Sequence, residues 1–261
     1  MATENTHNSS TAQPLTIGLI IIGDEVLSGK RQDRHLHNAN KLLRPRGLAL
    51  SWVKILGDEP NRLEATLRES FANGDCVFCF GGIGATPDDR TRQCAAAALQ
   101  VPLKRHPEAV AEIEAQFGEA AYPQRVKMAE YPQGAQVIPN FFNRVPGFTI
   151  SNHHFMPGFP KMAEPMMEWV LDNYYSQYFG EQQIEKAILI HDGQESEWIE
   201  FMEAFEQEFP ELRLFSLPKI TDEGKRLIEL GAEGQKNLVE QGIKKMVVEV
   251  EARGLIWENL Y

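Results

Sequence analysis

Cysteine is scarce in this chain of 261 residues, which holds only Cys76, Cys79 and Cys94. So few cysteines, in odd number, do not build a disulfide framework, and they fit a protein of a reducing compartment such as the cytoplasm. Cys76 and Cys79 have CxxC spacing, but they lie in an apolar run typical of a strand, where residues three apart point to opposite faces. We therefore expect buried thiols rather than a shared zinc ion or a redox pair.

Long hydrophobic runs and an excess of basic residues are also lacking. No stretch of 18 apolar residues occurs, so the sequence predicts no membrane span. The chain has 26 lysines and arginines against 37 aspartates and glutamates, and the net charge of −11 opposes binding to nucleic acid or anionic lipid. Residues 1–14 are polar, lack the pattern of a secretory signal, and are predicted to form a disordered arm. We accordingly expect a cytoplasmic protein that binds a small molecule.

Strand and helix patterns alternate along most of the chain. Apolar runs at 15–22, 48–56 and 76–80 are typical of strands, and each is followed by a helical pattern. This order predicts an α/β fold, a doubly wound and mostly parallel sheet with helices on both faces. We assign residues 15–178 to this domain, and residues 180–261, with a β-α-β-β-α order, to a small α+β unit.

The segment with the strongest chemical signal follows the third strand and reads GGIGATPDDRT, from position 81 to position 91. Thr86 fits the N-cap of a helix, and Pro87 fits its first helical residue. Free backbone amides at the start of a helix bind anions, so this segment predicts a phosphate site. Three glycines would let those amides approach a ligand closely: Gly81, Gly82 and Gly84.

Two carboxylates, Asp88 and Asp89, stand beside this predicted phosphate site. They would repel a bare phosphate, so their presence favours a divalent cation such as Mg²⁺ between carboxylate and phosphate. The alternative is that the segment only begins a helix, with acidic residues placed to complement the helix dipole.

Acidic residues also follow the first two strands. Asp24 and Glu25 come after the first strand, and Asp58 and Glu59 come after the second. Because ligands of open α/β sheets bind beyond the carboxyl ends of the strands, we expect Asp24, Asp58 and Asp89 to converge at one edge. For Asp58, the alternative is a simple cap of the following helix.

Several ordered motifs resemble the molybdopterin-binding domain family. They are IGDEVLSG at 22–29, the Gly-Asp pair at 57–58, and the Gly-rich segment at 81–91. Within the family the likeness is greatest to the N-terminal domain of competence/damage-inducible protein A (CinA), whose Pro-Gly-x-Pro turn is matched at 157–160. The resemblance covers about residues 15–172. The unit after residue 180 is more weakly similar to the small second domain of CinA-type proteins.

This resemblance implies a pocket for a nucleotide or pterin that carries a diphosphate, molybdopterin among the ligands. It also implies hydrolysis of a nucleotide pyrophosphate such as ADP-ribose with a divalent metal. The resemblance implies a catalytic role for Asp24 and Asp89. It implies that Asp24, Asp88 and Asp89 are metal ligands. The residues expected to contact the ligand are Gly81, Gly82, Gly84, Thr86 and Asp58. The alternatives are a non-catalytic binding module, a molybdenum-cofactor biosynthesis protein, and an assembly or regulatory protein.

The family likeness further implies a homo-oligomer. The chain ends before the nicotinamide-nucleotide amidase domain that follows in CinA proteins, so we expect that activity to be absent. Three positions depart from the family pattern: Ala85 in place of proline, His35 in place of asparagine, and the segment 141–145. The last departure bears on the shape of the ligand pocket.

Further candidates carry weaker signals. Arg90 is expected either to steady a leaving phosphate or to be solvated, and Arg125 and Lys127 are candidates to face a phosphate from a middle helix. His153 and His154 are adjacent on a predicted strand, where neighbours point to opposite faces, so we expect structural roles for them.

Overall fold

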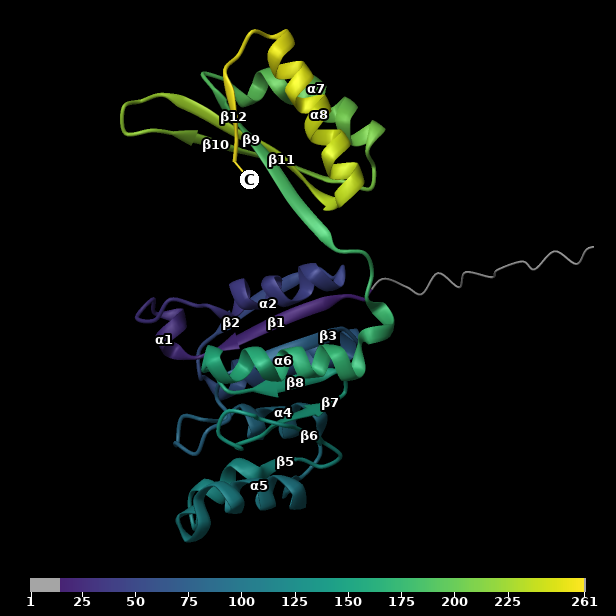
Figure 1. Cartoon of the computed structure of the whole chain (residues 1–261). Helices are drawn as coiled ribbons and strands as arrows, with labels where there is room; N and C mark the ends of the chain where they lie inside the picture. The colour runs from purple at the N-terminus through teal and green to yellow at the C-terminus, as the bar shows by residue number, and fades with distance from the viewer. Residues whose placement is uncertain (1–14, 261) are drawn as a thin grey trace, which may run out of the picture. The chain divides into compact units, whose positions relative to one another are not determined.

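The computed structural model describes residues 15–260, and the arm predicted for residues 1–14 lies outside the described residues. The chain divides into two compact units. One holds Ala49–Tyr178 together with the described residues up to Leu42, and the other holds Leu43–Leu48 together with the described residues from Phe179 onward. Figure 1 labels most of the helices and strands of both units.

The strands and longer helices of the first part of the chain follow in sequence order. They are β1 (Ile17–Ile22), α1 (Asp24–Leu27), α2 (His35–Leu43), β2 (Trp52–Leu56), α3 (Pro60–Asn73), β3 (Cys76–Phe80), α4 (Thr91–Leu99), β4 (Leu103–Arg105), α5 (Pro107–Phe117), β5 (Glu130–Pro132), β6 (Gln136–Ile138), β7 (Gly147–Ile150), β8 (His153–Met156) and α6 (Pro160–Tyr174). The second part contains β9 (Gln183–His191), α7 (Ile199–Glu208), β10 (Arg213–Ile220), β11 (Arg226–Gln235), α8 (Lys236–Ala252) and β12 (Trp257–Asn259).

The first unit is built on a six-stranded sheet in the order β2-β1-β3-β8-β7-β6. Strands β2, β1, β3 and β8 are parallel, while β7 runs antiparallel to β8 and to β6. The predicted doubly wound, mostly parallel sheet is thereby confirmed. In such a sheet the carboxyl ends of β1, β2, β3 and β8 meet at one edge, which is where the chemical motifs lie.

Helices cover both faces of this sheet (Figure 1). All six residues of β1 are buried, as expected of a strand covered on both sides. Ile20 and Ile22 pack into the core formed with α3, α4 and α5. On the opposite face, α6 packs against β8, and the His35 ring of α2 stacks on Phe80 at 4.4 Å between centroids.

The second unit is a four-stranded antiparallel sheet in the order β10-β11-β9-β12, with α7 and α8 packed against it. Its core contains Trp198 and Phe205 from the α7 region and Met246 from α8. The predicted α+β character is confirmed, and the short edge strand β12 adds an element that the sequence pattern did not predict.

The three cysteines are buried and free. Burial raises the pKa of Cys76 to about 12 and that of Cys94 to about 11, so these thiols stay protonated and unreactive near neutral pH. Among residues 15–260, no helix has the length and apolar character needed to cross a membrane.

Candidate functional site

The Gly-rich segment after β3 does not begin a helix at Thr86, and this prediction was wrong. Helix α4 begins at Thr91, five residues later. The Asp89 carboxylate accepts a hydrogen bond from the Thr86 N–H at 2.9 Å, and the Asp89 N–H donates to the Thr86 carbonyl at 3.1 Å. These bonds close a turn in which Pro87 occupies the second position, a common place for proline in turns.

Thr91 fastens this segment to the end of β3. Its hydroxyl donates to the Gly81 carbonyl at 3.0 Å, and its N–H donates to the Gly82 carbonyl at 3.0 Å. Gly81 has φ of +106°, and a Cβ there would lie 2.1 Å from the Ile22 carbonyl oxygen. Only glycine allows the segment to pass so close to the end of β1.

Asp24 and Asp58 join the ends of β1 and β2 by reciprocal hydrogen bonds. The Asp24 N–H donates to Asp58 Oδ2 at 3.0 Å, and the Asp58 N–H donates to Asp24 Oδ1 at 3.1 Å. Asp58 is therefore not the cap of α3, as one interpretation of the sequence had it. Glu59 fills that place, accepting from the N–H groups of Asn61 at 3.0 Å and Arg62 at 2.7 Å.

The Asp58 carboxyl is electrostatically crowded. Burial raises its pKa, the hydrogen bond from the Asp24 N–H opposes this rise, and the neighbouring carboxylates of Asp24, Glu25 and Asp88 add to it. A raised carboxyl pKa at a sheet edge marks a place where added positive charge would be favourable.

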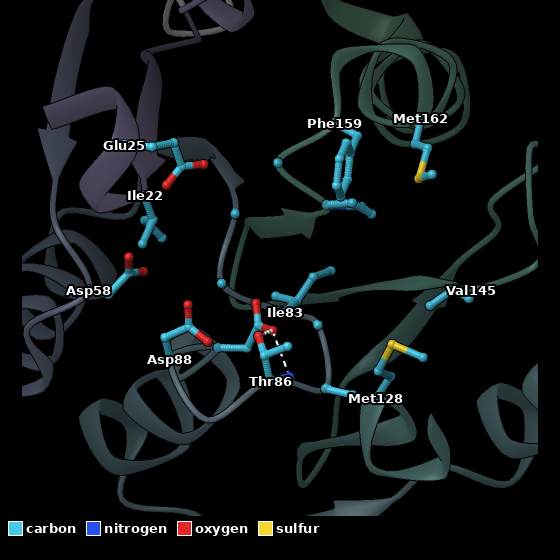
Figure 2. Close-up of a pocket in the computed structure, with 18 of the residues that line it drawn as sticks. Ile22, Glu25, Asp58, Ile83, Thr86, Asp88, Met128, Val145, Phe159 and Met162 are labelled. Carbon is cyan, nitrogen blue, oxygen red and sulfur yellow. Dashed lines mark hydrogen bonds between the residues drawn. The ribbon is translucent and has the colours of Figure 1, made fainter. Parts of the chain in front are cut away.

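A pocket of about 540 Å³ opens at this edge, within the first unit. This volume falls in the range of small-molecule sites. Figure 2 shows its two chemically different sides: Glu25, Asp58, Asp88 and Thr86 on one, and Phe159, Met162, Val145 and Met128 on the other. A ligand that fills both sides needs a polar, charge-bearing part and an apolar part.

Most of the residues predicted for the site line this pocket: Gly81, Gly82, Gly84, Thr86, Asp58, Asp88 and Asp89. Asp24 lines an adjoining depression, which it shares with Asp58, Asp88 and Arg90. Residues from three separate strand ends are thus brought to one edge of the sheet.

The predicted metal ligands do not, as they lie, form a metal site. Within the described part of the chain, no group of three or more His, Cys, Asp or Glu side chains is placed to hold a metal ion. The Asp89 carboxylate is held by Thr86, and those of Asp24 and Asp58 each accept from the other's backbone. The role of these residues as metal ligands stays a prediction.

The sequence pattern missed the cation of the pocket and most of its apolar side. Only Val145 of that side belongs to the segment 141–145, which was expected to bear on the shape of the pocket. Arg31 is the one basic residue that lines the pocket, against the four acidic residues Glu25, Asp58, Asp88 and Asp89. The Pro-Gly-x-Pro turn signalled a rigid segment, but nothing in it indicated that its exposed phenylalanine, Phe159, would line a ligand pocket.

Arg92 is a buried cation behind the Gly-rich segment, with 3% of its side chain exposed. Its guanidinium donates to the Gly84 carbonyl at 2.6 Å and also to the Lys127 carbonyl. It therefore ties two walls of the pocket together, since Gly84 and Met128 both line it. Sequence reasoning missed this residue because burial of an arginine leaves no local pattern.

The other basic candidates do not line the pocket. Arg125 donates to the Ala120 carbonyl at 2.8 Å, and Lys127 Nζ donates to the side chain of Gln124 at 2.8 Å. Arg90 donates to the Pro87 carbonyl at 3.1 Å and lies in the depression beside Asp24.

His153 and His154 are buried in β8, away from the pocket. His153 Nδ1 lies 2.9 Å from the Ser151 carbonyl oxygen, and its Nε2 lies 2.8 Å from Ser70 Oγ. His154 Nε2 lies 2.8 Å from Tyr175 Oη. Burial lowers the pKa of His153 to about 4 and that of His154 to about 3, so both rings are neutral and act in packing.

Comparison with known proteins agrees with this geometry. A family model described as "Probable molybdopterin binding domain" matches residues 18–177, which is more than half of the chain. The chain belongs to the molybdopterin-binding domain family. The matched region contains every residue named above as lining the pocket.

Within this family, the chain is similar to CinA-like proteins. It is 35% identical to one from Anaeromyxobacter sp. (strain K) over 60% of this chain and 40% of the relative, and 29% identical to one from Syntrophotalea carbinolica over 67% and 44%. The chain thus spans less than half of the length of these relatives. A solved structure described as the protein CinA with unknown function, from Thermoplasma acidophilum, is 24% identical with a TM-score of 0.57, covering 62% of this chain and 99% of that one. It shares the fold.

Proposed function

We propose that the pocket of this CinA-like molybdopterin-binding domain protein binds a nucleotide or pterin that carries a diphosphate, taken up together with a divalent cation. The observation that carries the proposal is the two-sided pocket. Its Gly-rich side lies at the strand ends, where phosphates bind in open α/β sheets. Its apolar side suits a planar ring.

The charged residues that line the pocket support the uptake of a divalent cation with the ligand. Four acidic residues and one arginine line it, so a bare diphosphate would be repelled. A diphosphate that arrives with Mg²⁺ brings the positive charge that the crowded Asp58 carboxyl favours. In this proposal the cation is part of the ligand and arrives with the diphosphate.

Hydrolysis of the bound diphosphate is a second candidate, and the position of Asp58 favours it. The Asp58 carboxylate lies in the pocket beside the Gly-rich segment, where a carboxylate can act as a general base. In this step Asp58 would take a proton from a water molecule as that water attacks phosphorus, and the terminal phosphate ester would leave.

Calorimetric titration with ADP-ribose tests the binding proposal, carried out with MgCl₂ and with EDTA. We expect binding that requires Mg²⁺ and that Asp58→Asn weakens about tenfold, since one carboxylate is lost from the cation's surroundings. Glu223→Gln, at an exposed glutamate of the second unit, is the matched control for loss of one negative charge. Binding that is equally tight in EDTA would contradict the proposal.

Chromatography of the same mixtures tests hydrolysis. AMP and ribose 5-phosphate appearing with wild type and not with Asp58→Asn would establish turnover. Intact ADP-ribose after binding would leave the protein as a binding module.

A further inference from the structure

Phe159 is a large apolar side chain left open to solvent in the pocket. Of its surface, 57% is exposed, and it lies in the turn that leads into α6. The Phe159 carbonyl accepts the N–H groups of Met162 at 2.9 Å and Ala163 at 3.0 Å, which fixes the backbone that carries the ring. An exposed aromatic ring held on rigid backbone is typical of a binding surface rather than of a core.

A cation stands beside this ring. The Arg31 guanidinium carbon lies 5.9 Å from the centroid of the Phe159 ring, within the range of a cation–π contact. Glu25 Oε1 lies 3.5 Å from Arg31 Nη1. Arg31 is therefore held close to the aromatic ring, with guanidinium N–H groups left to donate to a ligand.

The groups around Phe159 suit a flat π-system better than an alkyl chain or a sugar. Met162 lies beside Phe159, and Val145 and Met128 line the same pocket (Figure 2). Thioether sulfurs make favourable contacts with aromatic rings, and guanidinium groups donate hydrogen bonds to ring nitrogens and carbonyls. A purine or a pterin offers both a π face and such acceptors.

We propose that Phe159 is a specificity-determining residue whose ring stacks on the purine or pterin end of the ligand, with Arg31 hydrogen-bonded to the edge of that heterocycle. This inference rests on the proposed function, because the diphosphate of the same ligand would lie on the Gly-rich side. The chain thereby distinguishes heteroaromatic diphosphates from diphosphates that lack a ring.

Binding of three probes, each with MgCl₂, tests the inference: ADP, a hydroxymethylpterin diphosphate and inorganic diphosphate. For Phe159→Ala we expect dissociation constants about 10-fold to 100-fold weaker for at least one of the two ring-bearing probes, as stacking on one aromatic side chain implies. Inorganic diphosphate should change less than about twofold. Phe159→Trp should restore ring binding, and Phe141→Ala, at another exposed phenylalanine that does not line this pocket, should change nothing.

Two results would overturn the inference. One is unchanged binding of both ring-bearing probes by Phe159→Ala. The other is an equal loss for inorganic diphosphate, which would mean that the substitution disturbs the turn rather than a stacking contact. Wild-type protein that binds none of the three probes would instead refute the proposed function itself, and the inference with it.

Discussion

Mild acid should destabilise the first unit through His153 and His154, the buried histidines of β8. The pKa of His153 is lowered to about 4 and that of His154 to about 3 by burial, whereas an unfolded histidine takes up its proton near pH 6.5. Between these values the unfolded chain binds more protons than the folded one. Stability is therefore fully present above pH 6.5 and is lost as the pH falls toward 4.

The magnitude follows from the width of this window. Each histidine removes up to about 1.4 kcal/mol of unfolding free energy per pH unit. From pH 6.5 to pH 4, His153 alone accounts for about 3 kcal/mol, a large part of the 5–15 kcal/mol of a typical domain. The native contacts of His153 favour its neutral form, because the Ser151 carbonyl and the Ser70 hydroxyl are hydrogen-bond partners for the two nitrogens of a neutral ring.

Urea unfolding followed by circular dichroism at pH 7, 6, 5 and 4.5 measures this slope. His153→Gln removes one titrating group, and His37→Gln, at an exposed position of α2, is the control. We expect the slope of His153→Gln to be shallower than that of wild type by up to about 1.4 kcal/mol per pH unit, and the control to match wild type. Equal slopes for wild type and His153→Gln would refute the reasoning.

Three substitutions test the framework of the pocket. Gly81→Ala should lower the melting temperature and abolish Mg²⁺-dependent ADP binding. We expect it to lose more than about 2 kcal/mol of unfolding free energy, because its Cβ would meet a backbone carbonyl. Gly134→Ala, also at positive φ but with open space around it, should lose only about 1–2 kcal/mol. Thr91→Val should lose about 1–2 kcal/mol in urea unfolding, which Thr91→Ser should recover, because a buried carbonyl loses its hydroxyl donor. Arg92→Met should weaken ADP binding at least fivefold in calorimetry, with partial recovery in Arg92→Lys, because two carbonyls that align the pocket walls lose their shared donor.

Local sequence patterns predicted the sheet well because each central strand is buried on both faces. The continuous apolar runs of β1 and β3 have no other stable position than the middle of a covered sheet. The bounds predicted for β3 agree with the structure residue for residue. The acidic residues that follow β1 and β2 could be placed at one edge for the same reason, since parallel strands end together.

The start of α4 and the apolar side of the pocket could not be predicted in this way. Thr86 and Thr91 are both good helix-start residues, and the choice between them depends on the carbonyls of Gly81 and Gly82, which only the folded sheet brings near Thr91. Phe159, Met128 and Val145 come from three distant segments. No local period links such residues, so only the tertiary structure shows that they share a surface.

The reciprocal bonds between Asp24 and Asp58 also give the protein two built-in reporters. Both amide hydrogens belong to solvent-facing residues, yet each is bonded to a carboxylate, so both should exchange with deuterium more slowly than exposed amides usually do. A cation that draws the carboxylates away must release these hydrogens, and their exchange would then accelerate. Uptake of the cation and opening of the link between β1 and β2 would thus be read from the same two signals.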